Sequence, residues 1–141
     1  MLIVERARIE EILVGLDLLP LIEEAFRGYS AGRAIVPPVG ELLLDRGEVH
    51  IKYGAITDDD YYVIKVASGF YDNPSLGLPS SNGLMLVFCQ NTGEPEAVLL
   101  DEGHLTDVRT AVAGAVAARL LAPPKVDRIG VLGTGVQARL Q

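Results

Sequence analysis

The sequence predicts an α+β fold with a mainly antiparallel sheet, followed by the first strand, glycine turn and helix of an α/β domain. Three observations predict it. The first 30 residues show helical periodicity, short strand-like runs follow one another between residues 41 and 100, and a glycine motif lies near residue 135. These features indicate two units, residues 1–125 and residues 126–141.

Two helices are expected at the start of the chain. Apolar residues from Ile9 to Leu16 recur at the spacing of one helix face, and the pattern resumes in a new phase after Pro20. Because proline fits a helix only in its first turn, we expect a break near residues 17–20. Gly32 is the expected end of the second helix.

The middle of the chain reads as a sheet, because short apolar runs alternate with turn residues. The last two runs are separated by residues 91–95 and form a predicted hairpin. The expected strands are residues 41–44, 49–53, 61–67, 84–90 and 96–100.

The pattern changes back to helical between Leu105 and Leu121. Five alanines and a glycine lie in this run, so another element can pack close to the helix. Pro123 and Pro124 end it. A new strand is then expected from Arg128.

The glycine motif is Gly133-x-Gly135-x-x-Ala138, preceded by an apolar run. Such a strand, turn and helix is typical of a Rossmann dinucleotide-binding unit, in which a pyrophosphate lies on the helix N-terminus. The motif alone is weakly specific, and the strand before it strengthens the interpretation. Since the chain ends one turn into this helix, we expect either that it is a piece of a longer enzyme or that the motif is not a dinucleotide-binding turn.

The composition excludes several functions. A net charge of −7 and a pI of about 4.7 argue against nucleic acid and anionic membranes as partners. Cys89 is the only cysteine, so no internal disulfide forms, and its apolar surroundings predict a buried thiol. The sequence shows no leader and no apolar span of about 20 residues, so a cytoplasmic protein is expected.

Two cationic residues are candidates for chemistry. Strand alternation places Lys65 on the face of Tyr61, Val63 and Ala67, and an ammonium among apolar neighbours has a lowered pKa suited to acid–base work. The alternative is a lysine that covers a sheet edge. Arg109 could offer its guanidinium to a carboxylate, or it could be a surface arginine.

Other polar groups are expected to be structural. His50 and His104 have no companions at metal-ligand spacing, so no metal site is predicted. Residues 58–60 form an acidic turn, and residues 80–83 are interpreted as a polar loop without a histidine–acid arrangement.

Four blocks of this sequence together resemble the ornithine cyclodeaminase/mu-crystallin family. Their order and spacing match over nearly the whole chain, which is more specific than the glycine turn alone. The blocks are IKVASGFYDN (64–73), LTDVRTA (105–111), LAPP (121–124) and GTGVQA (133–138).

The resemblance implies an NAD- or NADP-dependent enzyme that acts on an amino acid or cyclic imine. Residues 1–125 would then form a substrate-binding and dimerisation domain of a homodimer. Lys65 would be the catalytic residue that moves the proton, and Arg109 would bind the α-carboxylate. The implied cofactor-binding residues are Gly133, Thr134, Gly135, Val136 and Gln137.

The chain departs from the family pattern at one contact. Many members carry an arginine where Gly40 and Glu41 stand here. Lys52 or Arg46 could replace it, and Lys52 is the predicted substrate-binding residue. The exact substrate therefore stays open. The alternatives are a non-catalytic small-ligand-binding protein of the mu-crystallin type, or a stand-alone dimerisation module. The 141 residues alone are expected to be inactive.

Overall fold

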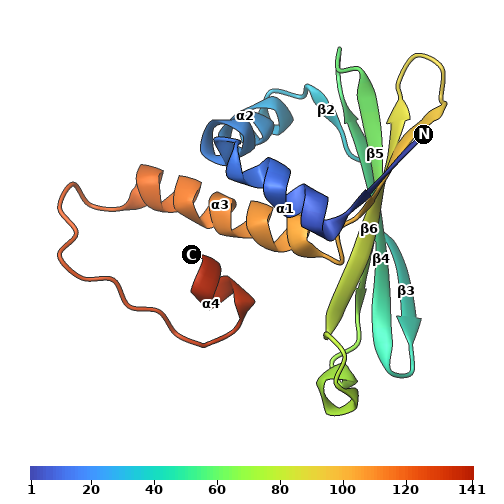
Figure 1. Cartoon of the computed structure of the whole chain (residues 1–141). Coiled ribbons are helices and arrows are strands. Elements are labelled where there is room, and N and C mark those ends of the chain that lie inside the picture. The colour runs from blue at the N-terminus through green and yellow to red at the C-terminus, as the bar shows by residue number, and fades with distance from the viewer.

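The computed structural model describes residues 1–141 as one seven-stranded sheet with helices on one side (Figure 1). The strands are β1 (Leu2–Glu5), β2 (Ala34–Ile35), β3 (Gly40–Leu44), β4 (Gly47–Ile56), β5 (Tyr61–Gly69), β6 (Ser81–Cys89) and β7 (Pro95–Leu100). The helices are α1 (Arg6–Val14), α2 (Leu18–Ser30), α3 (His104–Leu121) and α4 (Val136–Leu140), with a 3-10 turn η1 (Asn73–Leu76).

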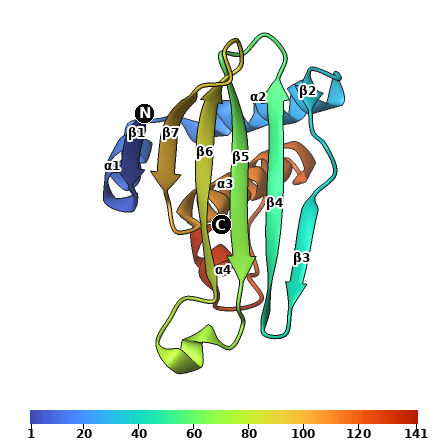
Figure 2. The same cartoon turned by 90° about the vertical axis from the view of Figure 1, so that its right-hand side faces the viewer.

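The sheet is mainly antiparallel, as predicted. Its order is β1-β7-β6-β5-β4-β2, and β3 pairs with the other end of β4 (Figure 2). The exception is β1, which runs parallel to β7. All five predicted strands and the hairpin between β6 and β7 are present, whereas β1 and β2 were not predicted.

The predicted break between the first two helices is confirmed. α1 ends at Val14, and Asp17 begins α2 by accepting a hydrogen bond from the backbone N–H of Leu19 at 3.3 Å. Pro20 then lies in the first turn of α2, where its missing N–H costs no helical hydrogen bond. Gly32 follows the helix with φ of +72°, a conformation that favours glycine.

The helices lie against one face of the sheet, which we call the inner face (Figure 1). α3 crosses this face, and α2 packs against α3, where Glu23 of α2 forms an ion pair with Arg119. As expected for a helix of small residues, α3 allows close approach. A Cβ added to Gly114 would lie 2.7 Å from the side-chain oxygen of Gln141.

The opposite, outer face carries no helix (Figures 1 and 2). The strand register places a continuous set of apolar side chains on it, with Tyr62 and Phe88 stacked at a ring-centroid distance of 5.0 Å. Further members are Leu42, Val49, Ile51, Tyr53, Ile64, Val66, Leu84, Leu86, Val98 and Ile3.

The chain exposes much more surface than a compact monomer of its mass. Its accessible surface is 10205 Å², whereas a folded monomer of 15.1 kDa exposes about 7,100 Å². Only five residues are buried, and Ile9, Ala111 and Val116 are the apolar side chains among them. Many apolar side chains are therefore exposed, and Leu42, Ile51 and Tyr53 of the outer face are among them.

Two predictions of secondary structure are wrong. Residues 128–132 form no strand, because no neighbouring strand lies beside them to accept and donate the ladder hydrogen bonds. Residues 81–83 are not a loop: Ser81 and Asn82 begin β6, paired with Gly69 and Ser68 of β5. Backbone pairing there needs no apolar side chain, so the polar composition was misleading.

None of the helices combines the length and the apolar composition needed to cross a membrane.

Candidate functional site

A lysine in the middle of the sheet is the centre of the candidate site. Lys65 of β5 points from the inner face toward α3, where its Nζ donates a hydrogen bond to Thr106 Oγ1 at 3.0 Å. The register places Lys52 of β4 directly opposite on one side and Met85 of β6 on the other. The face predicted for Lys65 is therefore the face that α3 covers.

The surroundings of Lys65 favour its neutral amine. Its pKa is lowered from the ordinary value, first by partial burial and then by repulsion from Arg109 and Lys52. The buried carboxylate of Asp101 acts in the opposite direction. An amine with a lowered pKa can accept and donate a proton closer to neutral pH than a surface lysine can.

The two other cations near Lys65 are exposed and have no ion-pair partner in the chain. Arg109 extends from the first half of α3, one turn after Thr106. Lys52 stands on the neighbouring strand, opposite Lys65. Arg46, by contrast, lies in the turn between β3 and β4, about 20 Å along the strand from Lys52. The geometry therefore favours Lys52 over Arg46 as the additional cation.

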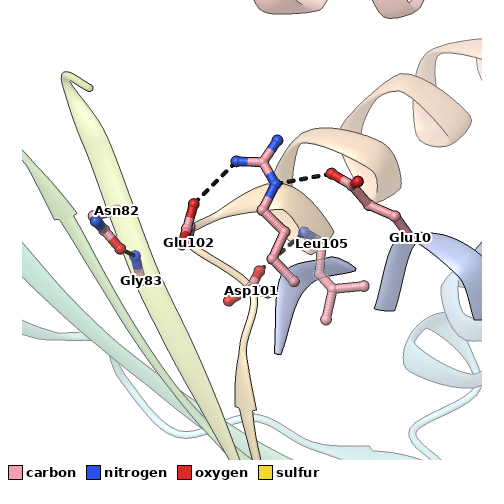
Figure 3. Close-up of polar contacts among 7 residues, drawn as sticks. Glu10, Asn82, Gly83, Asp101, Glu102 and Leu105 are labelled. Atoms are coloured by element: carbon pink, nitrogen blue, oxygen red, sulfur yellow. Dashed lines mark hydrogen bonds and ion pairs between the residues drawn. The ribbon is translucent and has the colours of Figure 1, made fainter. Parts of the chain in front are cut away.

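The N-terminal end of α3 is held by a buried carboxylate. Asp101 is 1% exposed, and its Oδ2 accepts a hydrogen bond from the backbone N–H of Leu105 at 2.9 Å (Figure 3). Nearby, the exposed Arg6 joins Glu10 at 2.8 Å and Glu102 at 3.2 Å, which ties α1 to the loop before α3. These contacts fix the position of Thr106 and Arg109 over the sheet.

A polar pocket of about 170 Å³ opens beside the first turn of α3. Its floor is the inner face of β5 and the start of β6, where Ala67, Gly69 and Ser81 leave little side-chain bulk. Thr106 and Asp107 of α3 form the opposite wall. Thr106 therefore links the pocket to Lys65.

Three residues that the sequence did not point to as functional line the pocket. Glu48 Oε1 accepts a hydrogen bond from the Tyr71 hydroxyl at 2.8 Å, and this bond lowers the pKa of Glu48 and raises that of Tyr71. His50 was expected to be structural or on the surface. It is half-buried in the pocket wall, with Nε2 3.6 Å from Glu48 Oε2.

The signal that could have found these residues is the strand period. Glu48, His50 and Lys52 alternate along β4 and therefore share the face of Lys65.

Cys89 differs from its expected state as well. It is half-buried rather than buried, and hydrogen bonds with the Thr92 hydroxyl and the N–H groups of the following turn lower its pKa.

The glycine turn keeps an open approach for a phosphate-bearing ligand. Gly133 has φ of +111°, and an added Cβ at Gly133 or Gly135 would meet no atom within 4 Å. Gly135 precedes α4 and provides no side-chain cap, so the first N–H groups of α4 are free for another acceptor. Thr134 lies between the two glycines. These features fit the pyrophosphate of a dinucleotide, although the preceding strand is not formed.

One side chain joins this turn to the pocket. Gln137 of α4 donates from Nε2 to the backbone oxygen of Asp107 at 3.1 Å and to Asp107 Oδ1 at 3.4 Å. Because Asp107 also lines the pocket, the first turn of α3 contacts both the pocket and the start of α4.

This fold and site define a class of proteins in which an α+β sheet domain, with a half-buried lysine beside a polar pocket, leads into a glycine turn. The chain belongs to the ornithine cyclodeaminase/mu-crystallin family, whose model matches residues 1–141. The resemblance seen in the sequence is thereby confirmed.

Similar proteins include a cyclodeaminase of Sinorhizobium fredii with no characterised activity, 47% identical over 131 residues, which cover 89% of this chain and 39% of that protein. Among solved structures, the Δ1-pyrroline-2-carboxylate reductase of Thermococcus litoralis in complex with NADH and L-proline has a TM-score of 0.91 at 30% identity. An archaeal alanine dehydrogenase dimer with bound NAD has a TM-score of 0.88 at 30% identity.

Both structures cover 99% of this chain, and the chain covers 44% of the reductase and 43% of the dehydrogenase. The chain thus spans about two-fifths of the length of the relatives it matches. The similarity supports a family of NAD(P)-dependent enzymes and leaves the specific substrate open.

Proposed function

We propose that the whole protein is an NAD- or NADP-dependent enzyme that interconverts an amino acid and its imine, by cyclising deamination or by imine reduction. The observation that carries this proposal is Lys65: a half-buried amine with a lowered pKa, hydrogen-bonded to Thr106 at the edge of a polar pocket. The relatives named above act on substrates of this kind or bind such cofactors.

Each residue has a definite task in this proposal. The nicotinamide, when bound, exchanges a hydride with the substrate α-carbon. Lys65 accepts or donates the accompanying proton at the substrate nitrogen or at water. Arg109 binds the α-carboxylate with its planar guanidinium, and Lys52 adds a second positive charge opposite Lys65.

The proposed cofactor contacts lie in the glycine turn, which belongs to a second unit from residue 126 onward. Close approach of the pyrophosphate to the backbone at Gly133 and Gly135 fits the open space at both positions. Thr134, Val136 and Gln137 complete the turn and the first helical positions.

Lys65→Ala tests the chemistry in the whole protein. We expect turnover to be abolished while NADH binding stays nearly unchanged, because Lys65 lies on the sheet and not in the glycine turn. Arg109→Lys is expected to raise KM more than it lowers kcat, since a point charge cannot replace a bidentate fork. Equal turnover in Lys65→Ala would remove this residue from the mechanism.

A screen of amino acids and cyclic imines, with NADH oxidation and NAD reduction as the readout, separates an enzyme from a non-catalytic ligand-binding protein. The binding-protein alternative predicts ligand binding with no turnover of any member of the panel.

We also propose that the protein is a homodimer joined through the outer face of the sheet. Two features support this: no helix covers the outer face, and its apolar side chains include Ile3, Leu42, Ile51 and Tyr53, which are 42–65% exposed. The interfaces of obligate homodimers are more hydrophobic than those of weak complexes. The archaeal alanine dehydrogenase is likewise a dimer.

A matched pair of substitutions tests the dimer. Ile51 lies on the outer face and is 42% exposed, while Ile12 lies on α1 and is 44% exposed. Light scattering after size exclusion is expected to show a dimer for the wild type and Ile12→Glu, and a monomer or a loss of soluble protein for Ile51→Glu. A dimer that persists in Ile51→Glu would place the interface elsewhere.

A further inference from the structure

The end of the Lys65 side chain is held by one contact. Lysine carries its charge on a flexible four-carbon stem, so the place of Nζ depends on what holds it. Within the chain, Nζ donates a single hydrogen bond, to Thr106 Oγ1 at 3.0 Å. The residues opposite Lys65 on the neighbouring strands are Lys52, a second cation, and Met85, which offers no oxygen. The position of this amine is therefore set by Thr106.

Thr106 is itself fixed at the start of α3. Its backbone N–H donates to the backbone oxygen of Gly103 at 3.0 Å, and its backbone oxygen accepts the Thr110 hydroxyl at 2.7 Å. Asp101 accepts the N–H of the preceding residue at 2.9 Å. The β-branched side chain of threonine has few rotamers in a helix, so Oγ1 has little freedom. The contact thus joins a flexible amine to a rigidly placed oxygen.

The hydroxyl of Thr106 is available to Lys65 alone. The Thr110 hydroxyl, one turn later, bonds to the helix backbone, whereas that of Thr106 makes no other hydrogen bond within the chain. An ammonium has three N–H donors, and a neutral amine has two and a lone pair. Since Oγ1 is the acceptor, the bond persists in both protonation states and leaves the lone pair of the neutral amine unoccupied. Such a lone pair can take a proton from a substrate nitrogen or from water.

We propose that Thr106 is a positioning residue for the proposed reaction, which holds the Lys65 amine in one place in both protonation states and keeps its lone pair free for the substrate. This inference rests on the proposed function, because it takes Lys65 as the group that moves the proton. Thr106 acts through Lys65 and needs no contact with the substrate. Valine has nearly the same shape as threonine but no oxygen, so Thr106→Val removes the contact and keeps the volume.

The hydrogen bond also favours the charged form of Lys65, because an ammonium donates more strongly to an oxygen than a neutral amine does. Partial burial, Arg109 and Lys52 lower the pKa of Lys65, and Asp101 acts in the opposite direction. Loss of the Thr106 hydroxyl is therefore expected to lower the pKa of Lys65 further. The charged or titratable groups on the elements around Lys65, all unchanged in the variants below, are Lys52 and His50 of β4, Arg109 and Asp107 of α3, and Asp101.

NMR titration of the whole protein, isotope-labelled at lysine Cε, tests the contact without any substrate. The Lys65 signal is the one that disappears in Lys65→Met. We expect its titration midpoint to lie at lower pH in Thr106→Val than in the wild type, and to stay close to the wild type in Thr106→Ser, which keeps the hydroxyl. Thr92→Val is the matched control. The Thr92 hydroxyl lies in the turn between β6 and β7 and accepts the N–H of Glu94, so its loss is expected to leave the midpoint unchanged.

Steady-state kinetics tests the consequence for the reaction. In Thr106→Val, kcat is expected to fall about ten- to hundredfold while KM changes by less than about threefold, since the amine is misplaced but Arg109 still binds the carboxylate. Thr106→Ser is expected to recover most of the loss. Equal losses in both variants would show that the helix start rather than the hydroxyl matters, which overturns the proposal. If Thr106→Val does not fold, Thr106→Ala and Thr106→Ser give the same comparison, because they differ only in the hydroxyl.

The outcomes separate this inference from the proposed function. An unchanged midpoint in Thr106→Val overturns the role of Thr106 even where turnover is found, and so does a shifted midpoint with an unchanged kcat. A shifted midpoint with no turnover of any amino acid or imine supports the hold of Thr106 on the amine, and in that case the proposed chemistry fails alone.

Discussion

Asp101 allows a quantitative test of how the site is positioned. It is the one fully buried charged residue, and its carboxylate accepts the N–H of Leu105 at the start of α3. Asp101→Ala removes this cap and the negative charge at the helix N-terminus. A lost cap costs about 0.5–2 kcal/mol, and a partly buried charge at a helix terminus contributes up to about 2 kcal/mol. We therefore expect the free energy of unfolding to fall by about 2–3 kcal/mol.

Asp101→Asn separates the two contributions, because the amide oxygen can still accept the hydrogen bond while the charge is lost. Its expected cost is about 1 kcal/mol. Both changes are measured by urea unfolding followed by circular dichroism. For a chain of this size, 1 kcal/mol corresponds to about 2–4 °C in Tm, so Asp101→Ala is expected to melt about 5–10 °C lower.

Asp17→Ala is the matched control. Asp17 also begins a helix, but it is exposed and accepts the N–H of Leu19 at the longer distance of 3.3 Å. Its loss is expected to cost about 0.5 kcal/mol. If Asp17→Ala lowers the free energy of unfolding as much as Asp101→Ala does, the burial of Asp101 does not strengthen its contribution to stability. The larger effect expected for Asp101 is then refuted.

Two more predictions concern the sheet. The lowered pKa of Lys65 means that the unfolded chain binds more protons than the fold between that lowered pKa and about 10.4, so stability from this group rises with pH through the window. Lys65→Met is expected to flatten this rise, measured by urea midpoints from pH 7 to pH 10; an unchanged slope contradicts it. A Cβ at Gly83 would lie 2.6 Å from the Val66 backbone oxygen, so Gly83→Ala is expected to cost about 1–3 kcal/mol. Gly130→Ala, which would meet nothing within 4 Å, is expected to be neutral in the same unfolding assay.

Local sequence patterns were sufficient to predict the strands and helices whose apolar side chains alternate or recur at helical spacing. The five predicted strands and the two-helix start follow from apolar spacing, and the ends of each element differ by a few residues. β6 begins at Ser81, earlier than predicted, because its polar first residues pair through the backbone with the end of β5. β1 was missed since its four residues have no visible period and its partner, β7, is about 95 residues away in sequence.

The site was only partly predictable for a related reason. Lys65 and Arg109 were selected as candidates from their sequence setting and the family blocks. Glu48 and Tyr71, by contrast, come together only through the register of β4 with β5 and the turn after Gly69. Hydrogen bonding between strands selects one register among several, and the apolar pattern does not reveal which polar side chains then meet.

The contact between Gln137 and Asp107 adds a physical link between the two predicted units. Gln137 stands at the start of α4, where a pyrophosphate is proposed to lie, and its amide nitrogen is engaged with the backbone and side chain of Asp107. Asp107 in turn lines the pocket one residue after Thr106, the partner of Lys65. A ligand that draws Gln137 away from Asp107 must therefore break two hydrogen bonds near Lys65, the proposed proton-transfer group. Cofactor and substrate would then act on the same first turns of α3 rather than on separate parts of the chain.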